Sequence, residues 1–199
     1  MAEVKDESNL LNEEQQVDAK KVDRSMLIKC FEEKNFVQAE KFAKILLDTA
    51  KEEHGDESVN AWQAWMEYIE VQKRLKKDKI ALELYLNLEP LTIKLFGEDH
   101  EQSASVFNNI AMLYYHTFQH SKTIPYFKKT LAIWEKIYPA NDPHVITTRN
   151  NIFVNSQMAV FDQESAAHGV KIIKMDYTRD LQGRKPQNND VKIIQIIEG

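Results

Sequence analysis

Residues 103–151 read SASVFNNIAMLYYHTFQHSKTIPYFKKTLAIWEKIYPANDPHVITTRNN. This stretch predicts one helix, a tight turn, a second helix and the start of a third, because apolar residues recur three, four and seven positions apart in each half. The predicted inward residues are Phe107, Ile110, Ala111 and Tyr114, followed by Ile124, Phe127, Leu131 and Trp134. A helix pair with an apolar face on each member cannot bury both faces alone, so the stretch predicts stacked copies of itself.

Copies of this unit are found by shifting the sequence by 42 residues. The shift aligns the end-of-helix dipeptides at 54–55, 96–97 and 138–139. It also aligns Ala39, Ala81 and Thr123, small residues expected where helices cross. The next aligned sets are Phe42, Leu84 and Tyr126, and then Ala43, Tyr85 and Phe127. The period fits two helices and two short connections, so the sequence predicts a helical solenoid.

Three segments carry a resemblance to a known family. They are FNNIAMLYY at 107–115, IWEKIYPANDPHVITTRNNI at 133–152 and LTIKLFGEDHEQSASV at 91–106. They resemble the 42-residue tetratricopeptide repeats of kinesin light chain, over about residues 25–160. The heptad arm that precedes those repeats in kinesin light chain has no counterpart here. The resemblance implies an all-α solenoid of antiparallel helix pairs in a right-handed superhelix.

The chain divides into three expected regions. Residues 1–18 are acidic and are expected to form a flexible tail. Residues 19–168 are expected to hold about three and a half tetratricopeptide repeats. In residues 169–199 the period changes to β-branched runs, VKIIKMDY at 170–177 and VKIIQIIEG at 191–199, which predict a β-hairpin or two extended arms.

The expected helices span residues 17–33, 36–53, 60–76, 78–96, the central pair, and 144–161. Gly55 is expected to end the second helix, and Asp142-Pro143 to begin the last. Pro125 is expected in the first turn of its helix, and Pro90 is expected to bend its helix or to face water. After residue 161, DQESAAHG provides at most two helical turns before Gly169.

Composition limits the classes of function. The 199 residues are 43% hydrophobic and 29% charged with a net charge of −5, which provides no global attraction for nucleic acid or anionic membranes. No apolar run approaches the ~20 residues of a membrane span. A single cysteine, Cys30, is typical of a reducing compartment. The acidic start of the sequence favours a cytoplasmic protein, with a cilium, an axoneme or a mitochondrion as alternatives that need no visible presequence.

The sequence predicts no enzyme, no metal and no cofactor. His116 and His120 stand four residues apart, as metal ligands on a helix do, but nothing local supplies further ligands. Cys30 lies on an apolar helix face and is interpreted as a core residue. Phosphate-binding glycine loops, paired aspartates and nucleophile elbows are missing from the sequence.

The resemblance places a binding groove on the first helix of each pair. The implied groove residues are Met66, Glu67, Glu70, Lys73, Arg74, Ser105, Asn108, Asn109, Met112, Tyr115, His116, Asn150, Asn151 and Val154. It further implies that Asn109 and Asn151 hold the backbone of an extended peptide, although Glu67 occupies that position one repeat earlier. The other interpretation of these asparagines is ordinary helix surface. Lys73 and Arg74 form either a solvated helix end or a basic rim that attracts acidic peptides.

These observations favour a non-enzymatic scaffold or adaptor that binds an extended peptide in the concave groove. The expected partners are proteins, bound through the groove and the C-terminal strands within a larger complex, without nucleic acid. Three alternatives stay open: a structural subunit of a large axonemal, ciliary or mitochondrial assembly, an accessory subunit of an enzyme, and an RNA-binding helical repeat. Acidic groove residues count against RNA.

Overall fold

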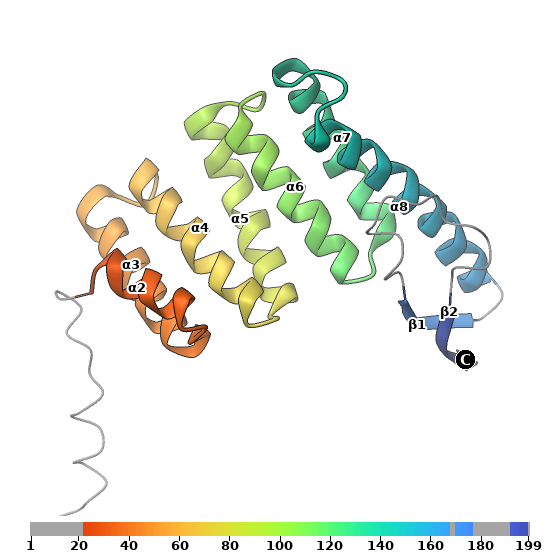
Figure 1. The fold of residues 1–199 in the computed structure, drawn as a ribbon, viewed down its shortest axis with the longest axis horizontal. Coiled ribbons are helices and arrows are strands. Elements are labelled where there is room, and N and C mark those ends of the chain that lie inside the picture. The colour runs from red at the N-terminus through yellow and green to blue at the C-terminus, as the bar shows by residue number, and fades with distance from the viewer. Residues whose placement is uncertain (1–21, 168–169, 177–191, 199) are drawn as a thin grey trace, which may run out of the picture. The chain divides into compact units, whose positions relative to one another are not determined.

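The computed structural model describes residues 22–167, 170–176 and 192–198, with side chains through residue 163. Within these residues the chain forms seven helices and two strands (Figure 1). The helices are α2 (Arg24–Glu32), α3 (Phe36–His54), α4 (Val59–Arg74), α5 (Asp78–Phe96), α6 (Glu101–His116), α7 (His120–Ile137) and α8 (Pro143–Ala167). The tail expected at 1–18 lies outside the described residues.

The chain folds as two compact units, residues 1–77 and 78–199. In the first unit α3 packs against both α2 and α4. In the second unit α6 packs against α5 and α7, and α8 packs against α7. Within each unit, helices that are neighbours in sequence pack against each other, which is the packing of an all-α helical repeat.

The 42-residue period of the sequence is reproduced by the backbone. Helices α3, α5 and α7 begin at residues 36, 78 and 120, and helices α4, α6 and α8 begin at residues 59, 101 and 143. We call α4, α6 and α8 the first helices of their repeats, and α3, α5 and α7 the second helices. Both series advance by 42 residues, so the helices of successive repeats begin at equivalent positions.

The turn between the first and second helix of a repeat is conformationally identical in three places. Lys34, Lys76 and Phe118 have φ angles of 56°, 60° and 58°. The amide that follows each one donates to a carbonyl five residues back: Asn35 to Cys30 at 2.8 Å, Lys77 to Gln72 at 3.0 Å and Gln119 to Tyr114 at 2.9 Å. This is the Schellman arrangement, which satisfies carbonyls at a helix end. It usually uses glycine at the left-handed position, and here three residues with side chains occupy it.

The next residue in that series is Val160, and α8 continues through it. A β-branched side chain strongly disfavours the left-handed conformation that the turn requires. The helix therefore does not stop after 16 residues, as α6 does, but extends over 25 residues to Ala167. The sequence predicted an end near residue 161. The structure corrects this, because the DQESAA segment prolongs α8.

Polar side chains mark where several helices begin. Asn35 Oδ1 accepts from the amide of Gln38 at 3.2 Å, and Ser58 Oγ accepts from that of Ala61 at 3.0 Å. Asp142 accepts from the amide of His144 at 2.8 Å, directly before the helix that starts at Pro143. These contacts satisfy amides that have no partner inside the helix. The expected start at Asp142-Pro143 is confirmed.

The core is built where small residues let the helices approach each other. Ala39, Ala81 and Thr123 are completely buried, as the 42-residue alignment predicted. The predicted face of α6 is also buried in full. On α7, however, Phe127 is buried whereas Ile124, Leu131 and Trp134 are only partly so. Because α7 packs against helices on both sides, the buried strip is rotated to include Thr123, Thr130 and Ile133.

Two prolines lie inside helices. Pro90 is in α5, and Pro125 is the sixth residue of α7, not in its first turn as expected. Both prolines are exposed to solvent. A proline removes one amide from the helical ladder, and on the exposed side of a helix water can satisfy the carbonyl that loses its partner.

The two β-branched runs form strands β1 (Val170–Asp176) and β2 (Lys192–Glu198). They pair antiparallel, with Val170 opposite Glu198 and Asp176 opposite Lys192, and with irregular register around Lys174. Of the two arrangements that the sequence predicted, the structure has the paired one.

Candidate functional site

The predicted groove residues lie in both units. Met66, Lys73 and Arg74 are on α4 in the first unit. The others are on α6 and α8 in the second unit: Ser105, Asn108, Asn109, Met112, Tyr115, His116, Asn150 and Asn151. All of them are partly or fully exposed, so none is a buried core residue. We describe the two sets separately.

An apolar patch joins α6 to α8 in the second unit. Tyr115 of α6 packs with Val154 and Phe161 of α8 around the buried Met158. Met112, one turn before Tyr115, is partly buried as well. We call Met112, Tyr115, Val154 and Phe161 the apolar patch. Of its members, the sequence missed Phe161 alone, because its helix was expected to end there.

A buried histidine fixes the position of this patch. His120, at the start of α7, is 2% exposed, and its Nδ1 lies 3.2 Å from Asn155 Oδ1 of α8. Asn155 Nδ2 donates to the carbonyl of Asn151 at 2.8 Å, so the Asn155 oxygen accepts and His120 Nδ1 carries the proton. The Tyr115 ring lies 5.5 Å from the His120 ring. His120 thus ties three helices together at the edge of the patch.

The two histidines considered as metal ligands have separate environments. His120 is buried against Asn155, whereas His116 is exposed with Nδ1 at 3.7 Å from Asp78. In the part of the chain that the structure describes, no three His, Cys, Asp or Glu residues gather as a metal site would require. Near His120, burial raises the pKa of Asp162, while the histidine acts in the opposite direction.

The asparagines of the predicted groove interact with their own helices. Asn109 Nδ2 donates to the carbonyl of Ser105, four residues earlier, at 2.9 Å. The carbonyl of Asn151 accepts from Asn155. A peptide that paired with Asn109 would compete with the contact to Ser105. The geometry therefore accommodates both the helix-surface and the peptide-binding interpretations.

The basic residues of α4 are paired with an acid. Lys73 Nζ and Arg74 Nε lie 2.9 and 2.7 Å from the Glu70 carboxylate. Burial acts against ionisation of Glu70, but the hydrogen bonds from Lys73 and Arg74 prevail and lower its pKa. Glu67, in the position of Asn109 one repeat earlier, is held by Arg24 at 3.0 Å. These pairs offset much of the positive charge expected on this rim.

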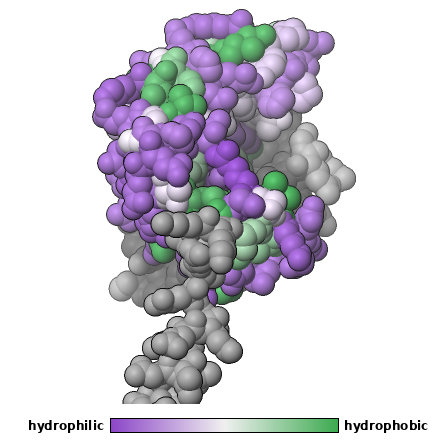
Figure 2. Space-filling model, turned by 90° about the vertical axis from the view of Figure 1, so that its left-hand side faces the viewer, coloured by the Kyte–Doolittle hydropathy of each residue, from purple (hydrophilic) through white to green (hydrophobic). Residues whose placement is uncertain are grey.

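The surface at the N-terminal end of the first unit is mainly hydrophilic, with separate apolar patches (Figure 2). Exposed apolar side chains on α2 and α3 include Ile28 and Val37, which are 58% and 66% exposed. Such isolated residues are normal on protein surfaces. They indicate no binding site by themselves.

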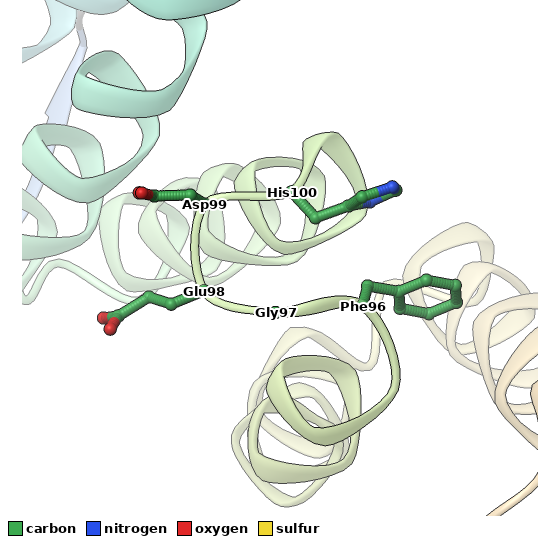
Figure 3. A pocket seen from close by; sticks show the side chains of 5 residues that line it. All are labelled: Phe96, Gly97, Glu98, Asp99 and His100. Carbon is green, nitrogen blue, oxygen red and sulfur yellow. The ribbon is translucent and has the colours of Figure 1, made fainter.

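An open pocket lies at the connection between α5 and α6, lined by residues 96–100. Figure 3 shows the Phe96 and His100 rings on one side and the Glu98 and Asp99 carboxylates on the other. The two rings stack with centroids 5.3 Å apart, and Asp99 pairs with Lys136 of α7 at 2.8 Å. Ser103 Oγ donates to the carbonyl of Gly97 at 2.6 Å. These contacts hold the turn in shape, and the carboxylate of Asp99 is already engaged.

Comparison with known families identifies the central unit. Residues 103–144 match the model of a tetratricopeptide repeat. This segment is a tetratricopeptide repeat. The matched segment contains most of α6, the turn at Phe118 and all of α7, which are the elements that the sequence quoted first predicted.

Solved structures support the same fold along more of the chain. Nearly identical repeats of a putative kinesin light chain from Podosopora anserina match with a TM-score of 0.62 at 13% identity, covering 71% of this chain and 67% of that one. BtubC (BKLC) from P. vanneervenii matches with a TM-score of 0.61 at 20% identity, covering 87% of this chain and 68% of that one. At such identities the likeness concerns the fold, and this chain is not kinesin light chain itself.

Among curated proteins, none matches the sequence significantly. None of the described helices is long and apolar enough to cross a membrane. Tetratricopeptide repeats in general present stacked helices as surfaces for protein partners, and the repeats found here support that general role.

Proposed function

We propose that this protein is a non-enzymatic interaction scaffold that binds an extended peptide along α6 and α8. The observation that carries the proposal is the apolar patch together with the two asparagines beside it. Asn109 and Asn151 are 42 residues apart and occupy equivalent positions on the first helices of successive repeats. Apolar side chains offer pockets for peptide side chains, while amides can donate to and accept from a peptide backbone.

The surroundings of the patch favour a peptide with apolar anchors. Met112 and Tyr115 provide a flexible thioether and an aromatic ring, which are frequent on peptide-binding surfaces. The residues beside them on α6, such as Asn108 and Ser105, are uncharged. We therefore expect apolar contacts to contribute most of the binding affinity. Hydrogen bonds from the asparagines would fix the register of the peptide.

Two more surfaces belong to the proposal. On α4, Met66, Lys73 and Arg74 form a separate contact surface, whose charge is moderated by Glu70. At the C-terminus, each strand of the two-stranded sheet has one neighbour, and an unpaired strand edge can accept a further strand. We infer a place in a larger complex, and a cytoplasmic location that is supported by the single, buried Cys30.

The test begins with a random peptide library displayed on phage and selected on the purified protein. A selected peptide is titrated by fluorescence anisotropy against Asn109→Ala and Asn151→Ala. We expect each change to weaken binding by ~0.5–1.5 kcal/mol, which is roughly twofold to tenfold in Kd. Tyr115→Ala is expected to weaken binding more, because it removes an apolar contact.

The matched control is Asn87→Ala. Asn87 is an exposed asparagine within α5, a second helix, so the same change is made away from the patch. The Asn87→Ala variant should bind the selected peptide with the same affinity as the unmodified protein. If Asn109→Ala, Asn151→Ala and Tyr115→Ala also bind with unchanged affinity, the face of α6 and α8 is not the binding surface.

A further inference from the structure

Helix α8 has a second exposed face that the proposed peptide site does not use. Ile146, Phe153 and Val160 are 45%, 55% and 53% exposed. Their seven-residue spacing places them on one side of the helix, as in a coiled-coil seam. The stripe is roughly 21 Å long at 1.5 Å per residue. We call these three residues the α8 stripe.

The equivalent face of α6 is covered inside the fold. Forty-two residues before Ile146 and Phe153 stand Ala104 and Ala111, both completely buried. Ala104 and Phe107 pack with Ile133 of α7, along with the partly buried Tyr126 and Trp134 of α7 and Ile93 of α5. Ile146 and Phe153 therefore occupy positions that are buried on the first helix of the preceding repeat, whereas Val160 corresponds to Phe118, which lies in the turn and is 48% exposed. Within the described residues no helix follows α8, because the helix runs through Val160.

The order of residues along this face indicates what covers it. The stripe is symmetric about Phe153, so an antiparallel copy places Phe153 against Phe153 and Ile146 against Val160. The flanking positions are also compatible: Arg149 faces Gln157, and Asn150 faces Ser156. No like charges meet at these positions, and Arg149 is paired with Glu135 of its own chain at 2.6 Å. A surface that is complementary to itself under a two-fold rotation is the requirement for an isologous dimer.

We propose that the α8 stripe is a homodimer interface, in which a second copy of α8 packs antiparallel about a two-fold axis at Phe153. The aromatic pair at the axis supplies the centre of the contact. Each copy contributes three large apolar side chains, which is less than a standard stable interface. The dimer is therefore weak and depends on protein concentration. Val154 and Phe161 of the apolar patch directly follow Phe153 and Val160, so they lie about 100° around α8 from the stripe.

The first measurement is sedimentation equilibrium of the full chain over a wide concentration range. We expect a monomer–dimer equilibrium that Phe153→Asp weakens at least tenfold, because two carboxylates would meet at the axis. The control is Ile80→Asp, at an apolar residue of α5 that is 47% exposed and outside the stripe. Both positions are exposed, so circular dichroism should show unchanged folding. A chain that remains monomeric up to about 1 mM, the weak end of measurable association, overturns the proposal.

Cysteine cross-linking tests the geometry. A disulfide requires Cα atoms within about 7 Å, so a residue pairs with itself only near the axis. In a Cys30→Ser background, Phe153→Cys should cross-link with itself under mild oxidation. Ile146→Cys alone should not, but a mixture of Ile146→Cys and Val160→Cys should. Efficient self-cross-linking of Ile146→Cys would indicate a parallel arrangement and overturn the antiparallel dimer.

Discussion

Helices α6 and α8 begin 42 residues apart but end differently. α6 ends after 16 residues, its chain turns at Phe118 with φ of 58°, and α7 covers its apolar face. α8 runs on for 25 residues and leaves Ile146, Phe153 and Val160 exposed. At the position of Phe118, α8 has Val160, whose β-branched side chain disfavours the left-handed conformation of the turn. A repeat continues only where the chain can turn.

The largest effect should separate a covered aromatic residue from an uncovered one. Phe107 on α6 is 1% exposed, and Phe153 on α8 is 55% exposed. We expect Phe107→Ala to lower the free energy of unfolding by ~3–5 kcal/mol, through lost burial and the cavity left behind. Phe153→Ala should change it by less than about 0.5 kcal/mol when measured at low protein concentration.

Urea denaturation followed by circular dichroism measures both variants. Equal losses at the two positions would mean that α8 is covered in the folded monomer as fully as α6. The comparison between the two helices would then fail.

A smaller effect is expected from the contact that joins α8 to the start of α7. Asn155→Ala removes the acceptor of His120 Nδ1, whose ring is buried. Leaving a buried donor without its partner costs ~1–3 kcal/mol. We expect this loss of stability in urea denaturation, together with faster amide hydrogen exchange at the start of α7.

The double variant His120→Leu with Asn155→Leu provides the control, because it replaces both polar partners by apolar side chains. Stability should recover relative to Asn155→Ala. If Asn155→Ala is as stable as the unmodified protein, the hydrogen bond does not contribute to holding α8 against α7.

The smallest effect compares the turn position between repeats. Lys76 has φ of 60°, a conformation that glycine adopts without strain. Lys76→Gly should therefore raise the free energy of unfolding by about 0.5–1 kcal/mol. Val160→Gly, at the equivalent position of α8, should instead lower it by about 0.5–1 kcal/mol, because glycine weakens a helix interior.

Thermal denaturation of these two variants gives changes of opposite sign if the comparison holds. A loss of stability in Lys76→Gly would show that its side chain contributes more than the backbone strain removes. A gain in Val160→Gly would show that α8 is under strain where it passes the turn position.

The candidate site shows how far the residues could be interpreted before the fold was known. The helical period identified α6, and the resemblance placed Met112 and Tyr115 away from its core face, where the structure leaves both partly exposed. Phe161 was missed because α8 was expected to end near it. The helix continues there, since Val160 disfavours the left-handed conformation of a turn. His120 was considered as a metal ligand in a turn, whereas the structure buries it against Asn155, 35 residues later. A contact of that kind leaves no periodic signal.

Charge was the least predictable feature. Lys73 and Arg74 stand in a basic run of the sequence, which predicted either a solvated helix end or an electropositive rim. On the folded helix Glu70 lies three and four residues before them and binds both. The spacing in sequence permits this pairing. Each long side chain could also pair with other residues, and the fold decides which partner is near enough.

The sequence by itself determined the 42-residue period, the helix pairs and the small residues at the crossings, because these depend on local spacing and on volumes that repeat along the chain. The tertiary structure decided how the buried strip of α7 is rotated between two neighbouring helices, and which polar groups pair across helices. Burial and long-range hydrogen bonds depend on all the helices that surround a residue, so they appear only once the helices have packed.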